Sequence, residues 1–319
     1  MRISKSFLIN GVPQWLYIHR SPKARGSLFF LHGGPGWSDA PLAHLSCKNL
    51  WNDFNVIHWD QRGTNRSFFA KLDPTTLTVN QIVEDGLEVT RLLARELGIQ
   101  KPVVIGHSWG TLLGALMVKK APELFHTFIG VGQLVSNAKS EPISLDFCRK
   151  RAVETQREDL ALELSRMNQF FYKDLGLLFR QRELLFELGG EFNKAVSLAE
   201  FMEWLQLAPE ECRSSIKTLY ETCVFSMEQL WSEVIQVDLS VGSQSFDIPI
   251  VLAHGRSDFC TDFSTAEAWF QKVKAPKKTL VVFENSAHWP QIEENEKWSE
   301  FLLNYLPQAA RPKELEQRS

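Results

Sequence analysis

The sequence has few cysteines, and their spacing matches neither a metal site nor a disulfide framework. Its 319 residues include five cysteines, an odd number, with no Cys-x-x-Cys pair. This pattern favours free thiols in a reducing compartment. We find no cluster of metal-ligating residues, so we expect neither a metal ion nor any other cofactor.

Long hydrophobic runs and a strong excess of one charge are also missing. No segment approaches the roughly 20 apolar residues of a membrane-spanning helix, and the first residues show no apolar signal region. The formal net charge is −3, whereas nucleic-acid-binding domains are typically basic. We therefore expect a cytoplasmic protein that binds neither nucleic acid nor membranes. The composition leaves its oligomeric state open.

Short apolar runs alternate with helical patterns over most of the chain. The runs, which are typical of strands buried on both faces of a parallel sheet, lie at residues 28–31, 56–59, 103–105, 128–131, 250–253 and 280–283. Between them, Thr78 and Gln81 form a capping box that begins a helix ending at Gly98. The alternation predicts an α/β fold with a mostly parallel, doubly wound sheet flanked by helices.

One long segment interrupts this alternation. Residues 135–245 lack strand-like runs and are charged and rich in aromatic side chains. We expect a core in two parts, 1–134 and 246–308, with a helical cap at 135–245 over the active site and a polar tail at 309–319. The alternative is a helical domain packed elsewhere on the core.

Residues 106–110, Gly-His-Ser-Trp-Gly, match the pattern G-x-S-x-G of a nucleophile elbow. The motif follows the expected strand at 103–105 and begins an expected helix at 111–120. Such a turn exposes the serine hydroxyl at the carboxyl end of the sheet, beside a helix amino terminus that stabilises developing negative charge. Ser108 is therefore the expected nucleophile.

A serine nucleophile needs a general base, and histidine is the usual one. With this elbow, the acid and the histidine follow the serine in that order. His288 lies in the loop after the expected strand at 280–283. His254 and His126 lie within or beside expected strands, where a structural role suits them better. His288 is the expected base.

The acid should follow the preceding strand. Asp258 comes shortly after the expected strand at 250–253, while Asp262 is better placed to cap the next helix. We expect Asp258 to orient the histidine and to stabilise its protonated form.

A glycine-rich segment, His-Gly-Gly-Pro-Gly at 32–36, follows the expected strand at 28–31. We expect the backbone amides of Gly34 and Trp109 to form an oxyanion hole, in which one donor typically contributes about 3 kcal/mol in the transition state. The alternative is a turn without a catalytic role.

Three motifs together resemble the proline iminopeptidase family of α/β hydrolases: HGGPG at 32–36, DQRG at 60–63 and GHSWG at 106–110. The resemblance covers nearly the whole chain. It implies an α/β-hydrolase fold with an inserted helical cap, and a serine aminopeptidase that releases N-terminal residues, usually proline, from short peptides. In this family, acids of the cap hold the free amino group. We expect Asp60 and Arg62 to form a buried ion pair behind the oxyanion loop.

Departures from the family pattern concern the substrate. His107 stands where the family commonly has glycine or serine, and Arg256 stands where some members have a glutamate that helps to recognise the amine. A cation there would attract an anionic group instead. In the cap, Glu228 is our candidate for binding the amine, with Glu203 as a second. For both, an exposed helix face is the ordinary alternative.

Three functions remain open at this point. The motifs favour an aminopeptidase acting on a small molecule or short peptide, while Arg256 favours an esterase, amidase or lactonase acting on a small acyl substrate. A non-catalytic relative that only binds a ligand is the third reading.

Overall fold

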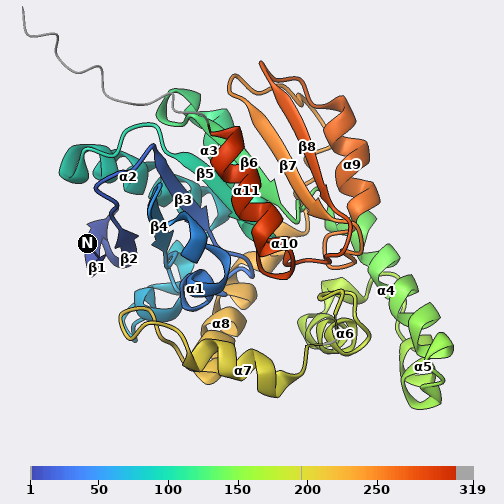
Figure 1. Ribbon diagram of the computed structural model, residues 1–319. Helices are drawn as coiled ribbons and strands as arrows, with labels where there is room; N and C mark the ends of the chain where they lie inside the picture. The colour runs from blue at the N-terminus through green and yellow to red at the C-terminus, as the bar shows by residue number, and fades with distance from the viewer. Residues whose placement is uncertain (1, 195, 307–319) are drawn as a thin grey trace, which may run out of the picture.

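The computed structural model describes residues 2–194 and 196–306. Its centre is an eight-stranded sheet in the order β1-β2-β4-β3-β5-β6-β7-β8 (Figure 1). β1 (Arg2–Ile9) and β2 (Val12–His19) form an antiparallel edge. The parallel strands are β3 (Ser27–Leu31), β4 (Asn55–Trp59), β5 (Val103–His107), β6 (Thr127–Val131), β7 (Ile250–Gly255) and β8 (Lys278–Phe283). The predicted α/β architecture is confirmed.

The edge hairpin turns within two residues. Ile9 pairs directly with Val12, and the turn residues Asn10 and Gly11 have φ angles of 44° and 79°. A type I′ turn requires positive φ at both positions, which asparagine and glycine tolerate.

Strand residues alternate between two hydrophobic clusters on opposite faces of the sheet. Phe29 and Leu31 of β3 belong to a large cluster with α2, α3 and α9. Leu28 and Phe30 belong to a second cluster with α11. These helices are α2 (Val79–Leu97), α3 (Trp109–Lys120), α9 (Phe263–Lys272) and α11 (Asn295–Tyr305). Two short helices lie in the connections between larger elements: α1 (Ala43–Ser46) between β3 and β4, and α10 (Pro290–Glu293) between β8 and α11.

Within the described residues, five α-helices lie between β6 and β7 and gather below the sheet in the view of Figure 1. They are α4 (Asn137–Glu154), α5 (Glu158–Ser165), α6 (Leu175–Glu187), α7 (Leu198–Gln206) and α8 (Ile216–Val234). We interpret them as the cap predicted at 135–245. The tail predicted at 309–319 lies outside the described residues. None of the described helices combines the length and apolar character needed to cross a bilayer.

Candidate active site

Ser108 occupies a sharp turn between β5 and α3. Its φ of 54° and ψ of −121° are unusual for a residue with a side chain. The flanking glycines are required, because a Cβ at Gly106 would collide with the carbonyl of Gly110, and one at Gly110 with the carbonyl of Leu31. The turn therefore has the geometry expected of a nucleophile elbow.

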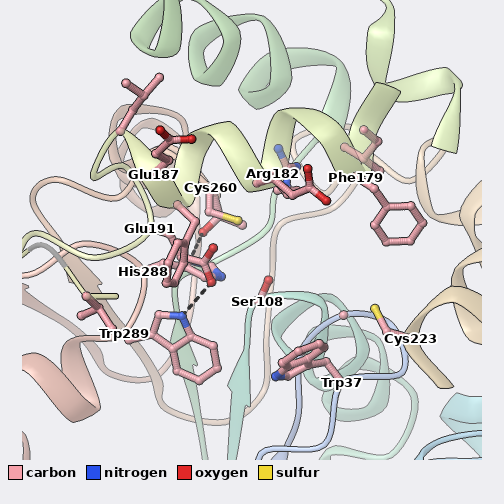
Figure 2. Close-up of a pocket in the computed structure, with 18 of the residues that line it drawn as sticks. Trp37, Ser108, Phe179, Arg182, Glu187, Glu191, Cys223, Cys260, His288 and Trp289 are labelled. Carbon is pink, nitrogen blue, oxygen red and sulfur yellow. Dashed lines mark hydrogen bonds between the residues drawn. The ribbon is translucent and has the colours of Figure 1, made fainter. Parts of the chain in front are cut away.

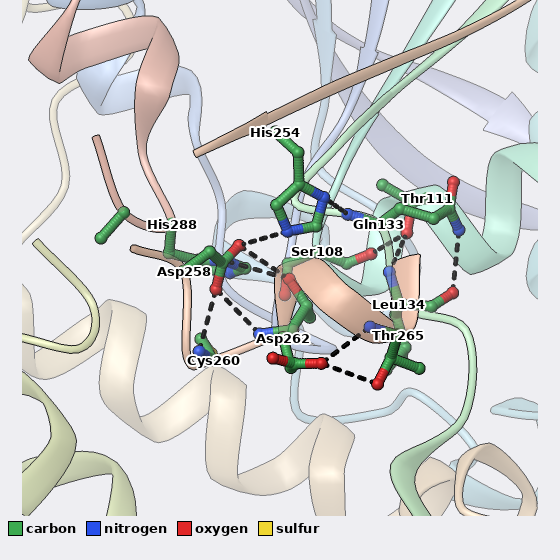
Figure 3. A network of polar contacts seen from close by, with 12 residues as sticks. Ser108, Thr111, Gln133, Leu134, His254, Asp258, Cys260, Asp262, Thr265 and His288 are labelled. Carbon is green, nitrogen blue, oxygen red and sulfur yellow. Dashed lines mark hydrogen bonds and ion pairs between the residues drawn. The ribbon is translucent and has the colours of Figure 1, made fainter. Parts of the chain in front are cut away.

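Asp258 and His288 are buried and bonded to each other. His288 Nδ1 lies 2.9 Å from Asp258 Oδ2, and Figure 3 shows the network around this pair. The backbone amides of Cys260 and Thr261 each donate to Asp258 Oδ1 at 2.9 Å, and His254 Nε2 lies 3.0 Å from Oδ2. The carboxylate is thus held in one orientation.

Electrostatics in this pair favour an ionised Asp258. Burial acts to raise the pKa of Asp258, but His288 and His254 outweigh it and hold that pKa well below its usual range. Burial likewise acts to lower the pKa of His288, and the charge of Asp258 raises it well above the ordinary value. The aspartate therefore stabilises a protonated histidine.

His107, which stands where the proline iminopeptidase family commonly has glycine or serine, supports the loop that carries His288. Its ring is buried, and Nε2 lies 2.9 Å from the carbonyl oxygen of His288. The ring also packs 4.2 Å from the ring of Trp289. Burial, aided by the nearby charge of His288, lowers the pKa of His107 to about 3. A neutral His107 can therefore donate its Nε2–H to the His288 carbonyl.

Gly34 and the amino terminus of α3 both face the cavity that contains Ser108 and His288. Gly34 has a φ of 107°, a conformation that favours glycine. Gln61 connects the two regions. Its Oε1 accepts from Trp109 Nε1 at 2.9 Å, and its Nε2 donates to the carbonyl of His32 at 3.3 Å.

The predicted ion pair between Asp60 and Arg62 is wrong. Arg62 instead binds Asp85 of α2 through two bonds of 2.7 and 2.9 Å. Asp60 accepts from Ser38 Oγ at 2.5 Å and from Tyr17 OH at 2.7 Å. Burial raises the pKa of Asp60 to about 6, although its hydrogen bonds act to lower that pKa. Asp60 thus fixes the segment after the glycine-rich loop through neutral donors.

A cavity of about 1120 Å³ lies between the core and the cap helices and contains Ser108, His288, Gly34 and Trp109 in its lining. This volume is slightly above the range typical of small-molecule sites, about 300–1,000 Å³. These residues come from three segments that are distant in sequence, the glycine-rich loop after β3, the elbow between β5 and α3, and the loop after β8, and the fold brings them to one place.

None of the three residues predicted for substrate binding, Glu228, Glu203 and Arg256, lines this cavity. Glu228 is exposed on α8, and Glu203 of α7 is exposed as well. Arg256 is exposed, bound to Glu284 at 2.9 and 3.0 Å, and stacked over Phe263. The prediction that Arg256 acts near the site is corrected, because its charge is used in this surface pair.

The described lining of the cavity contains seven charged residues that the sequence did not reveal: Glu141, Arg151, Arg157, Arg182, Glu183, Glu187 and Glu191. Arg182 donates to Glu141, which is 1% exposed. Glu191 accepts from Trp289 Nε1 at 3.1 Å, and its carbonyl accepts from the amide of His288 at 2.9 Å. Figure 2 shows Glu191 beside His288. The four glutamates and three arginines of the lining together carry a formal net charge of −1.

Comparison with known proteins defines the class. A model of the alpha/beta hydrolase fold matches residues 26–295. The chain belongs to this family, and it is a hydrolase.

Its relatives include aminopeptidases. A probable aminopeptidase, YbaC, from Bacillus subtilis is 28% identical, with 92% of each protein covered. The proline iminopeptidase of Saccharolobus solfataricus is 25% identical over 94% of this chain and 91% of that protein.

Solved structures share the fold. The proline iminopeptidase of Mycobacterium smegmatis superposes with a TM-score of 0.67 at 16% identity, covering 95% of this chain and 97% of that one. An esterase from Exiguobacterium antarcticum gives 0.60 at 16% identity, covering 95% and 99%. The expected resemblance to the proline iminopeptidases is confirmed.

Proposed function

We propose that the protein is a serine hydrolase in which Ser108 is the nucleophile, His288 the general base and Asp258 the residue that orients His288. The observation that carries this proposal is the 2.9 Å bond between Asp258 and His288 at the cavity onto which the elbow serine opens. The same arrangement of roles recurs in serine hydrolases of unrelated folds.

Hydrolysis proceeds in two halves. His288 takes the Ser108 proton while Oγ bonds to the substrate carbonyl carbon, and the amides of Gly34 and Trp109 stabilise the oxyanion. His288 then protonates the leaving nitrogen or oxygen as its bond to the carbonyl breaks. Water, deprotonated by His288, attacks the acyl-enzyme and restores Ser108.

The substrate class we propose is a short peptide or similar small molecule with a free N-terminal amino group, as for a prolyl aminopeptidase. The formal net charge of −1 carried by the charged residues of the cavity lining suits an ammonium group, and Glu191 lies beside His288 (Figure 2). An ammonium paired with a carboxylate makes a charge-assisted hydrogen bond, which is stronger than a neutral one.

An esterase acting on a small acyl substrate is the second candidate, favoured by the many apolar side chains of the cavity. Kinetics on proline arylamides and on 4-nitrophenyl acetate, with Ser108→Ala as the blank, distinguish the two. We expect cleavage of the arylamide by the wild type. Cleavage of acetate alone would reject the aminopeptidase and leave the esterase.

A further inference from the structure

One face of α8 forms an apolar wall of the cavity. Its members recur at helical spacing, four, three, four and four residues apart: Ile216, Tyr220, Cys223, Met227 and Trp231. We call these five residues the α8 stripe. At 1.5 Å per residue, the stripe extends over about 22 Å.

The neighbouring face of α8 fixes the helix against the core. Thr222 Oγ1 donates to the carbonyl of Gly36 at 3.3 Å, and Ser226 Oγ donates to that of Gly63 at 3.4 Å. A Cβ at Gly36 would lie 2.6 Å from Ser226, so the helix approaches the glycine-rich loop closely. The middle of the α8 stripe therefore passes beside the loop that carries Gly34.

The α8 stripe presents apolar surface from the cavity mouth to its interior. Tyr220 is 50% exposed, whereas Met227 and Trp231 are 5% and 6% exposed. The Trp231 indole N–H is satisfied by the carbonyl of Tyr172 at 2.7 Å. Phe179 of α6 extends the wall, since its ring lies 6.1 Å from that of Tyr220.

Glu191 and the α8 stripe, of which Figure 2 labels Cys223, lie on different sides of Ser108. In Figure 2, Glu187 and Glu191 are on one side of Ser108, and Phe179, Cys223 and Trp37 are on the other. A substrate whose amino group is held near Glu191 would direct its leaving group toward the apolar side.

We propose that the α8 stripe binds an elongated apolar leaving group, so that the preferred substrates are amphipathic aminoacyl compounds rather than polar peptides. The inference rests on the proposed hydrolase function and narrows its substrate class. Burying one methylene completely contributes about 0.8 kcal/mol, which corresponds to about a fourfold increase in kcat/KM. Partial burial corresponds to about a twofold increase.

The test uses two ester series whose alcohol part lengthens from methyl to octyl, one of L-proline and one of acetic acid. The first carries an ammonium group and the second does not. For wild-type protein we expect the octyl ester to exceed the methyl ester in kcat/KM by about a hundredfold or more. A ratio near one in an active series would overturn the inference.

The test distinguishes a failure of the aminopeptidase proposal from a failure of the inference about the α8 stripe. Activity on acetates alone rejects the aminopeptidase, while the chain-length ratio within the acetates still decides the role of the α8 stripe. Inactivity on both series contradicts the hydrolase and the inference together.

Variants locate the subsite. Tyr220→Asp and Phe179→Ser should each lower the octyl-to-methyl ratio by about tenfold or more, because a polar group replaces part of the wall. Glu221→Ala, an exposed residue on the same helix, should leave the ratio unchanged. Equal ratios in all three variants would place the apolar group elsewhere and reject the assignment.

Discussion

Gln61 joins the two segments that supply the proposed oxyanion donors. One end of its amide binds the indole of Trp109, and the other end binds the carbonyl of His32, two residues before Gly34. The side chain is 1% exposed, so it is held by these bonds in a fixed position. We infer that Gln61 is a positioning residue for the oxyanion hole.

Replacing Gln61 should therefore affect turnover more than binding. In Gln61→Leu we expect kcat to fall about ten- to a hundredfold with little change in KM, because misplaced amides weaken only transition-state stabilisation. Steady-state kinetics at a temperature where circular dichroism shows the variant folded will check this. A raised KM with unchanged kcat would contradict the positioning role.

The pH dependence follows from the His288–Asp258 pair. His288 must be neutral to act as a base, and Asp258 raises its pKa above the ordinary value of 6.5. We expect the acidic limb of kcat/KM to lie above pH 6.5, with activity lost as the pH falls through that limb.

Asp258→Asn should lower turnover by several orders of magnitude. It should also move the acidic limb to lower pH, because the variant lacks the negative charge that raises the pKa of His288. The pH–rate profiles of both proteins provide the measurement. An acidic limb at the same pH in the variant would show that another group is titrating.

Glu191 tests recognition of the amino group. Glu191→Gln should lower kcat/KM on proline arylamides about ten- to a hundredfold, because a charge-assisted hydrogen bond is lost. The effect on an acetate ester should be small. Glu228→Gln, which alters an exposed residue outside the cavity, is the matched control. An equal loss of kcat/KM on the proline arylamide and on the acetate ester would show that Glu191 has a structural role.

At the scale of elements, Asp85 ties α2 to the loop after β4 and to the edge hairpin. It accepts from Arg62, from Gln14 at 2.8 Å and from Asn10 at 2.9 Å. Arg62 and Asp85 are 2% and 0% exposed. A charge buried this deeply depends on its partner.

Arg62→Met should therefore lower the free energy of unfolding by about 3–5 kcal/mol, since it leaves the carboxylate of Asp85 without its cation. Urea denaturation gives the value. Arg95→Met, in an exposed ion-pair cluster at the end of α2, should change stability far less. A comparable loss in both variants would argue against the special role of the buried pair.

At the scale of the whole molecule, local patterns predicted the sheet and the elbow but not the cavity wall. The run at 103–105, the glycines around Ser108 and the capping box at Thr78 act on their own neighbours, and Thr78 does accept from the amide of Gln81 at 3.1 Å. Such signals can be recognised in the sequence because they depend on residues that are close together along the chain.

The charged wall has no local signal. Glu141 and Arg182 are 41 residues apart on two helices whose docking brings them together. Glu228 shows a different limit: it directly follows Met227, so helical spacing turns it about 100° away from the α8 stripe. Periodicity over 216–231 could have excluded it, whereas Glu191 depended on the tertiary fold.

Covalent capture of the nucleophile is the most direct test of the central claim. A fluorophosphonate reacts with a serine only where the hydroxyl is activated by a base. Intact-mass and peptide analysis of wild-type protein should show one adduct, on Ser108, and Ser108→Ala should show neither adduct nor turnover. Modification of another residue, or a Ser108→Ala variant that keeps a tenth of wild-type activity, would contradict the account.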